Sequence, residues 1–256
     1  MTETGTIKMQ AYRGMTGEKP DFRESRVNIY SIATTTKSIA GKCRIETEEE
    51  FAPVYQARPG MKLPAIIMID KQPQLVSAMW GLRSTTSANT IHMSRVLKSR
   101  TWNLRLRRQR CVIPANCFIA EKNGQAWLIR LPQYRMFLMG AVYQKKGNEY
   151  HFTLLETESP DLFASVAEDM PLVLPPDRMQ KWLTVTELDR IMHFADKAAN
   201  EYFDYFKIDT AALKANVNDK ELLRPIGMTH EQYRLREMQI KAVTFEKERM
   251  NRRGGK

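Results

Sequence analysis

Residues 79–118 read MWGLRSTTSANTIHMSRVLKSRTWNLRLRRQRCVIPANCF and place a run of positive charge between two apolar segments. Every charged residue from Arg95 to Arg110 is basic. A block of one sign repels itself unless a polyanion neutralises it. The apolar segments on either side predict that the block is embedded in a folded sheet protein. The stretch therefore indicates nucleic acid as a partner, although it does not by itself indicate any chemistry.

Length and composition agree with this interpretation and restrict it. The chain has 256 residues, 43% of them hydrophobic, and a net charge of +11, which allows one large domain or two small ones with a substantial core. Proteins this basic generally meet nucleic acid, an anionic membrane or an acidic partner. No apolar run approaches the roughly 20 residues that cross a bilayer, and residues 1–20 lack the apolar core of a secretory signal. We therefore expect no membrane partner.

The cysteines and histidines predict neither a disulfide scaffold nor a metal site. The three cysteines are an odd number without CxxC spacing, and the four histidines are scattered along the chain. This usage is typical of a reducing compartment. We expect a cytoplasmic protein, able to associate with the nucleoid, that carries no cofactor and no metal.

The order of short apolar runs and turn signals predicts an α+β fold with a curled, mostly antiparallel, barrel-like sheet, peripheral helices and an appended C-terminal helix. Turn signals such as Asn123-Gly124 and Gly147-Asn148 separate strands into hairpins. A polar, flexible N-terminal arm is expected over residues 1–26, the main domain over 27–226, and a basic, charged helix or tail over 227–256. The predicted strands are 27–34, 63–69, 74–80, 111–119, 126–131, 136–143, 150–156 and 170–174, and helices are predicted after Ser159, after Pro175-Pro176, over 186–203 and from Thr229.

Seven short motifs occur in an order that is similar to one known family. They are Ile29-Tyr30-Ser31-Ile32-Ala33, Ala57-Arg58-Pro59-Gly60, Trp80-Gly81-Leu82, Ser94-Arg95-Val96, Arg110-Cys111-Val112-Ile113-Pro114-Ala115, Met170-Pro171-Leu172-Val173-Leu174, and Val217-Asn218 with Glu221-Leu222-Leu223-Arg224-Pro225. Together they resemble the SOS response-associated peptidase (SRAP) family over about residues 27–226. The resemblance implies a protein that shields abasic sites in single-stranded DNA by a covalent DNA–protein crosslink.

The residues that would perform this crosslinking are replaced. The family uses an N-terminal cysteine, an asparagine, a glutamate and a histidine, and these positions align with Ile29, Met93, Ala120 and Ala167. None of the four replacements can act as a nucleophile or carry a proton. The resemblance therefore implies a scaffold that binds DNA non-covalently and has lost the family's chemistry.

The candidate DNA-binding residues are the basic block and its neighbours, and each has a structural alternative. Trp80 can stack on a base or fill the core, and the block can line a groove or form an ordinary solvated face. Two other functions remain open: docking of a protein partner through residues 1–26 or 229–256, and an active crosslinker using another nucleophile such as Cys43, which lies between Lys42 and Arg44. The predicted contacts to single-stranded or junction DNA are Arg58, Trp80, Arg83, Arg95, Lys98, Arg100, Arg105, Arg107 and Arg108.

Overall fold

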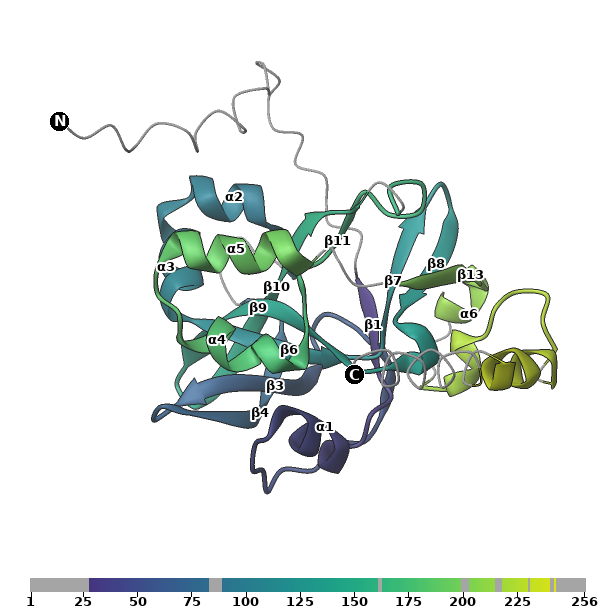
Figure 1. The fold of residues 1–256 in the computed structure, drawn as a ribbon, viewed down its shortest axis with the longest axis horizontal. Coiled ribbons are helices and arrows are strands. Elements are labelled where there is room, and N and C mark those ends of the chain that lie inside the picture. The colour runs from purple at the N-terminus through teal and green to yellow at the C-terminus, as the bar shows by residue number, and fades with distance from the viewer. Residues whose placement is uncertain are drawn as a thin grey trace, which may run out of the picture.

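A computed structural model of the chain describes residues 28–82, 89–160, 163–198, 203–214, 218–229, 231–239 and 242. Figure 1 shows two groups of strands with helices around them. No helix among these residues is both long and apolar enough to cross a membrane.

Five strands close into a barrel, which confirms the predicted barrel-like, mostly antiparallel architecture. Each strand pairs with the next around the ring, and the last pair, β4 with β10, is the parallel one. Closure leaves no free edge among these strands. The ring strands, in their order around the barrel, are β3 (Lys62–Ile69), β4 (Gln72–Trp80), β10 (Glu149–Glu158), β9 (Phe137–Lys146) and β6 (Arg110–Ala115).

A second, five-stranded sheet lies beside the barrel. Its strand order is β13-β8-β7-β1-β2, and it separates the main core from a smaller apolar cluster on its far side. Short strands extend the barrel's sheet where β10 and β9 continue past the ring. The bounds are β1 (Ile29–Ile32), β2 (Val54–Ala57), β7 (Cys117–Lys122), β8 (Gln125–Arg130) and β13 (Asp204–Ile208), with β5 (Thr90–His92), β11 (Asp169–Pro171) and β12 (Val173–Leu174) as the short strands.

The α-helices are peripheral, as expected. In Figure 1, α2, α3, α4 and α5 lie over one side of the barrel, whereas α6 lies at the other end beside β13. The helical elements are α1 (Thr36–Cys43), α2 (Met93–Lys98), α3 (Arg100–Arg108), α4 (Met179–Thr184), α5 (Leu188–Ala198) and α6 (Thr210–Lys214), with the 3₁₀ turns η1 (Pro132–Tyr134), η2 (Pro176–Arg178) and η3 (Lys220–Leu223).

Several element predictions were wrong in detail. The predicted strand 111–119 is two strands, β6 and β7, in different sheets. Asn116 lies between them, and its side-chain oxygen accepts hydrogen bonds from the backbone N–H groups of Ala33 and Thr34. Residues 163–166, after the predicted cap Ser159, form a turn and not a helix. The helices α1, α2 and α3 and the strand β13 were not expected from the sequence.

Gly140 shows how tightly α4 packs against the barrel. A Cβ at this position would lie 2.8 Å from Leu172 Cδ2 and 3.3 Å from Trp182 Cζ2. Trp182 is fully buried and donates its indole N–H to the carbonyl of Cys111 at 3.2 Å. Glycine is therefore required in this strand because side chains from two other elements fill the space next to it.

The C-terminal helix, residues 231–239, packs against the main domain instead of extending from it. Tyr233 donates a hydrogen bond to Tyr134 Oη at 2.9 Å, and Glu237 forms an ion pair with the buried Arg130. The expected domain boundary near Gly227 therefore separates two segments that share buried contacts. The expected arm, residues 1–26, lies outside the described residues.

Candidate nucleic-acid interface

The basic block folds into two short helices, α2 and α3, that meet at Ser99. Ser99 ends α2 and also begins α3, where its hydroxyl accepts a hydrogen bond from the Trp102 N–H at 3.5 Å. A serine at this position satisfies one of the unpaired amides of the new helix. The block is therefore rigidly placed on the outside of the barrel, against β6 and β9.

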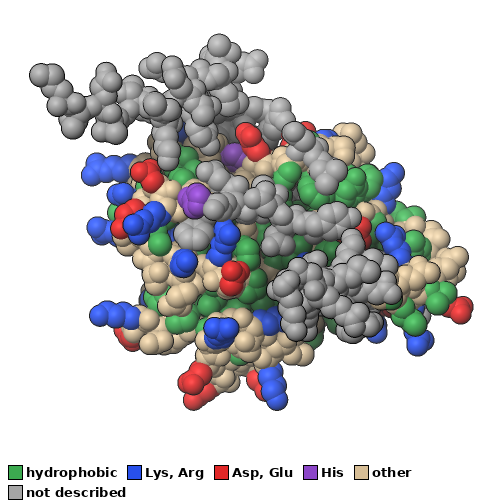
Figure 2. Space-filling view, viewed as in Figure 1, with side chains coloured by type: hydrophobic (Ala, Val, Ile, Leu, Met, Phe, Trp, Pro, Cys, Tyr) green, Lys and Arg blue, Asp and Glu red, His purple; other side chains and the backbone are tan. Residues whose placement is uncertain are grey.

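Three arginines of α3 lie on one face of the helix. Arg100, Arg107 and Arg108 are exposed, and their spacing of i, i+7 and i+8 brings them together. Leu104, which is 51% exposed, lies between them, while Leu106 is buried on the opposite side. Figure 2 shows blue side chains projecting on the side where Figure 1 places α2, α3 and α5, with fewer red ones among them.

Carboxylates compensate only part of the positive charge on this face. Hydrogen bonds from the backbone N–H groups of Glu187 and Thr186, together with the positive charges of Arg190 and Arg107, lower the pKa of the Glu187 carboxyl. Glu187 is therefore an electrostatic partner of Arg107. Lys98, Arg100 and Arg108 form no ion pair within the described part of the chain, and Arg95 and Lys98 are exposed on α2.

Two other arginines of the block point inward. The Arg105 guanidinium lies 5.7 Å from the centre of the Trp102 ring and is only partly exposed. Arg110 is buried and donates hydrogen bonds to the carbonyls of Trp182, Leu106 and Val185. Burial lowers the pKa of Arg110 to about 10, so it remains charged at neutral pH. It joins β6 to α4 and does not belong to the exposed face.

The prediction that Trp80 stacks on a base is wrong for this structure. Trp80 is 1% exposed, contacts the rings of Tyr30 and Phe152, and donates its indole N–H to the Asn89 carbonyl at 2.8 Å. Its ring therefore has no exposed surface on which a base could stack, and its only polar atom is satisfied. The core alternative is the correct one.

Two further candidates do not join the basic face. Arg58 turns toward the second sheet, where it donates hydrogen bonds to Gln56 Oε1 at 2.7 Å and to the Leu213 carbonyl in α6. Figure 1 shows α6 at the end of the molecule opposite α2 and α3. Arg83 lies outside the described residues. The exposed basic residues of these two helices are thus Arg95, Lys98, Arg100, Arg107 and Arg108, and we call this set the α2–α3 face.

The positions that we expect to align with the family's catalytic residues are buried and apolar. Met93, Ala120 and Ala167 are each 4% exposed or less and belong to the main core. Ile29 is also buried, but it lies in the smaller cluster on the other side of the second sheet. Because β1 pairs Ile29 with Ile119, these two share a face and Ala120 lies on the opposite one. The side chain of Ile29 therefore lies on the opposite face of the second sheet from that of Ala120.

Polar residues next to these positions cap a helix and lie close to two carboxylates. His92 Nδ1 accepts a hydrogen bond from the backbone N–H of Ser94 and lies 2.7 Å from its Oγ, while His92 Nε2 lies 3.6 Å from Asp169 Oδ1. Lys122 Nζ lies 4.0 Å from Glu168 Oε1. These contacts tie α2 and β7 to the segment that leads into β11. Acids and bases alternate here, unlike on the α2–α3 face.

The cysteines are not poised as nucleophiles. Cys43, Cys111 and Cys117 are all buried. Burial raises the pKa of Cys43 to about 11, against the opposing charge of Lys42, and raises that of Cys117 to about 12. The expectation that Lys42 and Arg44 favour a Cys43 thiolate is wrong because desolvation outweighs these exposed cations. No three His, Cys, Asp or Glu side chains among the described residues could together hold a metal ion.

The barrel with its flanking sheet defines an SRAP-type fold. A crystal structure of a protein from Bacteroides thetaiotaomicron matches 77% of this chain and 98% of its own length, with a TM-score of 0.64 at 14% identity. A phage-related protein from Bordetella bronchiseptica matches 72% of this chain and 94% of its own, with a TM-score of 0.57 at 15% identity. At these identities the likeness concerns the fold.

The family follows from the sequence comparison. The model of the SOS response-associated peptidase (SRAP) family matches residues 26–218, and the chain belongs to this family. The abasic site processing protein YoqW of Bacillus subtilis strain 168 is 24% identical over 160 residues, which cover 56% of this chain and 71% of YoqW. The protein of the same name from Bacillus phage SPbeta has the same identity and coverage.

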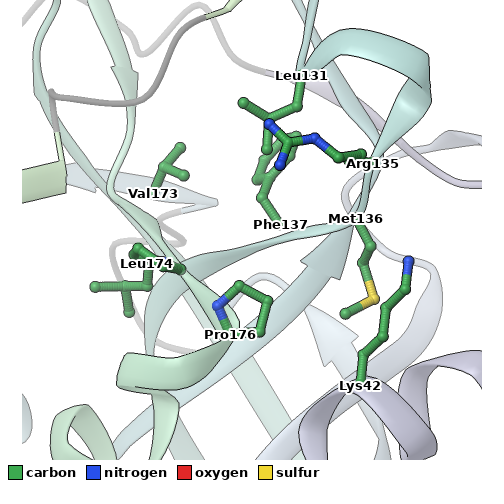
Figure 3. A pocket seen from close by; sticks show the side chains of 9 residues that line it. Lys42, Leu131, Arg135, Met136, Phe137, Val173, Leu174 and Pro176 are labelled. Atoms are coloured by element: carbon green, nitrogen blue, oxygen red, sulfur yellow. The ribbon is translucent and has the colours of Figure 1, made fainter. Parts of the chain in front are cut away.

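Two groups of charged residues were missed by the sequence interpretation. Arg130 is fully buried in β8 beside carboxylates from β13 and the C-terminal helix, and Lys42 and Arg135 line the same pocket although 93 residues separate them in the sequence (Figure 3). Their partners are distant in the sequence, so no local motif indicates either group.

Proposed function

We propose that this SRAP-family protein binds single-stranded or junction DNA non-covalently, through the α2–α3 face, without the crosslinking chemistry of the family. The observation that carries the proposal is the grouping of Arg100, Arg107 and Arg108 on one exposed helix face. Exposed guanidinium groups are available for phosphate oxygens, which dominate nucleic-acid affinity, and of these three arginines only Arg107 has a described carboxylate partner, Glu187. YoqW is named for processing abasic sites, and this name supports DNA as the polyanion that the present chain binds.

The loss of chemistry is supported by burial as well as by residue type. Met93, Ala120 and Ala167 are packed in the core, and a buried methyl or thioether group neither attacks an aldehyde nor moves a proton. The buried, protonated Cys43 thiol offers no substitute nucleophile. These features favour reversible binding over the alternative of an active crosslinker.

Fluorescence anisotropy with labelled single-stranded DNA at several salt concentrations tests the binding. If three to four phosphates are contacted, the logarithm of the association constant should fall with the logarithm of salt concentration with a slope of about −2 to −3. Absence of binding at low salt, or an affinity indifferent to salt, would contradict the proposal. A denaturing gel after incubation with abasic single-stranded DNA tests the chemistry separately, because a covalent complex would survive as a shifted band.

A second candidate function, docking of a protein partner, is favoured by one feature of the C-terminal helix. Leu235 and Met238 are 52% and 55% exposed, three residues apart on the side of the helix away from Tyr233 and Glu237. A double Leu235→Glu, Met238→Glu variant should lose any association seen by light scattering and leave DNA affinity unchanged. If light scattering gives the wild type and the double variant the same mass, the support for this candidate function is removed.

A further inference from the structure

A large apolar side chain is exposed at the centre of the basic surface of α3. Leu104 is 51% exposed. The exposed residues one turn before and one turn after it, at i−4, i+3 and i+4, are Arg100, Arg107 and Arg108. Side chains at these spacings are neighbours on the surface of a helix. Leu104 is therefore flanked by guanidinium groups in both directions along the helix.

The orientation of α3 directs Leu104 away from the barrel. Leu106 is fully buried, and Trp102 packs against the main core. At about 100° of rotation per residue, each of these two lies about 160° around the helix from Leu104. Leu104 therefore lies almost opposite the buried side of α3, where a bound molecule would meet it directly.

The neighbours of Leu104 distinguish it from other exposed leucines. A single exposed leucine is ordinary on a protein surface. Leu235 of the C-terminal helix is equally exposed, at 52%, and its neighbours at i−4, i+3 and i+4 are Glu231, Met238 and Gln239. The neighbours of Leu104 attract a polyanion, so a polyanion bound there is held against an apolar side chain.

The apolar surface that a polyanion offers to Leu104 is the face of a nucleic-acid base. In a duplex these faces are covered by stacking, and an apolar side chain must separate stacked bases to reach them. In a single strand the bases can be splayed apart. Arg100 and Arg108 each lie about 6 Å from Leu104 along the helix axis. A strand whose phosphates contact both arginines therefore passes close to the leucine.

We propose that Leu104 inserts between two unstacked bases of a bound single strand, while Arg100, Arg107 and Arg108 bind phosphates on either side. This inference rests on the proposed DNA binding and deepens it. Phosphates are present in single strands and duplexes alike, so contacts to them position the DNA without reading its bases. Leu104 supplies a preference for unpaired DNA that the arginines alone do not supply.

Fluorescence anisotropy with a labelled single strand and a blunt duplex of the same length tests the inference. Leu104→Ala should weaken single-strand binding about five-fold, the loss expected when roughly half of a leucine side chain is no longer buried. Duplex binding should change by less than about two-fold, because stacking covers the base faces. The slope of single-strand affinity against salt should stay the same, since no phosphate contact is lost.

Two further variants serve as controls. Leu104→Met keeps an apolar side chain of similar volume and should bind like the wild type. Leu235→Ala removes an equally exposed leucine from the C-terminal helix and should leave both affinities unchanged. Thermal melting establishes that each variant is folded.

The inference is overturned if Leu104→Ala keeps wild-type affinity for the single strand, or if it weakens single-strand and duplex binding equally. A flatter salt slope for Leu104→Ala also overturns it, because the arginine contacts would then be the ones affected. If no protein binds the duplex, the single-strand affinities and their salt slopes decide. A wild type that binds neither DNA contradicts the proposed function as well, whereas an unaltered single-strand affinity in Leu104→Ala removes this inference alone.

Discussion

Arg130 of β8 and Glu237 of the C-terminal helix form an ion pair of 2.6 Å in which the guanidinium is completely buried. Asp204 Oδ2 lies 3.4 Å from the same guanidinium nitrogen, Nη2, and the centre of the Tyr134 ring lies 4.1 Å from the guanidinium carbon. A charge removed from water in this way depends on its partners. Residues 231–239 are therefore part of the folded domain, although the sequence suggests a separate appendage.

The first prediction concerns the stability that this pair supplies. Glu237→Gln should lower the free energy of unfolding by about 3 kcal/mol, the lower end for removing one partner of a buried pair, because Asp204 still compensates part of the charge. Urea denaturation followed by circular dichroism measures the change. Glu221→Gln is the matched control: its pair with Arg224, at 3.4 Å, is exposed and should contribute about 1 kcal/mol or less. Equal losses in the two variants would show that the C-terminal helix is not locked by Arg130.

The second prediction concerns DNA affinity. An Arg100→Gln, Arg107→Gln, Arg108→Gln triple variant should bind single-stranded DNA at least ten-fold more weakly at low salt. Its salt dependence should be flatter by about 2 in the slope, since up to three phosphate contacts are lost. Lys220→Gln, an exposed lysine in η3, controls for net charge and should change affinity little. A triple variant with wild-type affinity would exclude the α2–α3 face as the binding surface.

The third prediction concerns pH. Burial raises the pKa of Cys43 to about 11 in the folded state, above the ordinary cysteine value of about 8.5, so the folded chain holds this proton more tightly than the unfolded chain. Stability from this group is complete below about pH 8.5 and is lost as the pH rises through 11. Cys43→Ala should make the decline in unfolding free energy between pH 9 and 11 shallower by up to about 1.4 kcal/mol per pH unit. Slopes that coincide would mean that Cys43 titrates normally.

The same burial predicts slow cysteine alkylation. At pH 8 the folded protein should react with iodoacetamide far more slowly than the urea-unfolded chain, as followed by mass spectrometry, because only the thiolate reacts and all three thiols are inaccessible. Rapid modification of Cys43 in the folded protein would contradict this prediction and support the hypothesis that Cys43 is a reactive thiol.

The fourth prediction compares two glycines. Gly140→Ala should destabilise the protein by about 1–3 kcal/mol, because the new methyl group would overlap Leu172 Cδ2. Gly41→Ala, in the middle of α1 with nothing within 4 Å of the new Cβ, should stabilise it by about 0.5–1 kcal/mol through helix propensity and a less flexible unfolded chain. Thermal melting of both variants measures whether each substitution lowers or raises the stability. A neutral Gly140→Ala would show that Leu172 and Trp182 can move aside.

The hairpins were predictable from local sequence. Asn123-Gly124 and Gly147-Asn148 mark their turns, and residues with positive φ are found there as the turn chemistry requires. The helices α2 and α3 were harder to predict because alternating arginines and apolar residues carry a weak helical pattern. The helical conformation of α2 and α3 depends on the packing of Val96 and Leu106 against the barrel. No short window of sequence shows this packing.

The sequence by itself determined the SRAP-type architecture, the basic character of residues 95–110 and the apolar character of Ile29, Met93, Ala120 and Ala167, because these are properties of residue types in a fixed order. Only the tertiary structure decided which charges are free to bind. It placed Trp80, Arg105 and Arg110 inward, turned Arg58 toward α6, and brought Glu237 to Arg130. Burial and partner choice arise when strands and helices distant in the chain close on one another, and composition cannot encode that outcome.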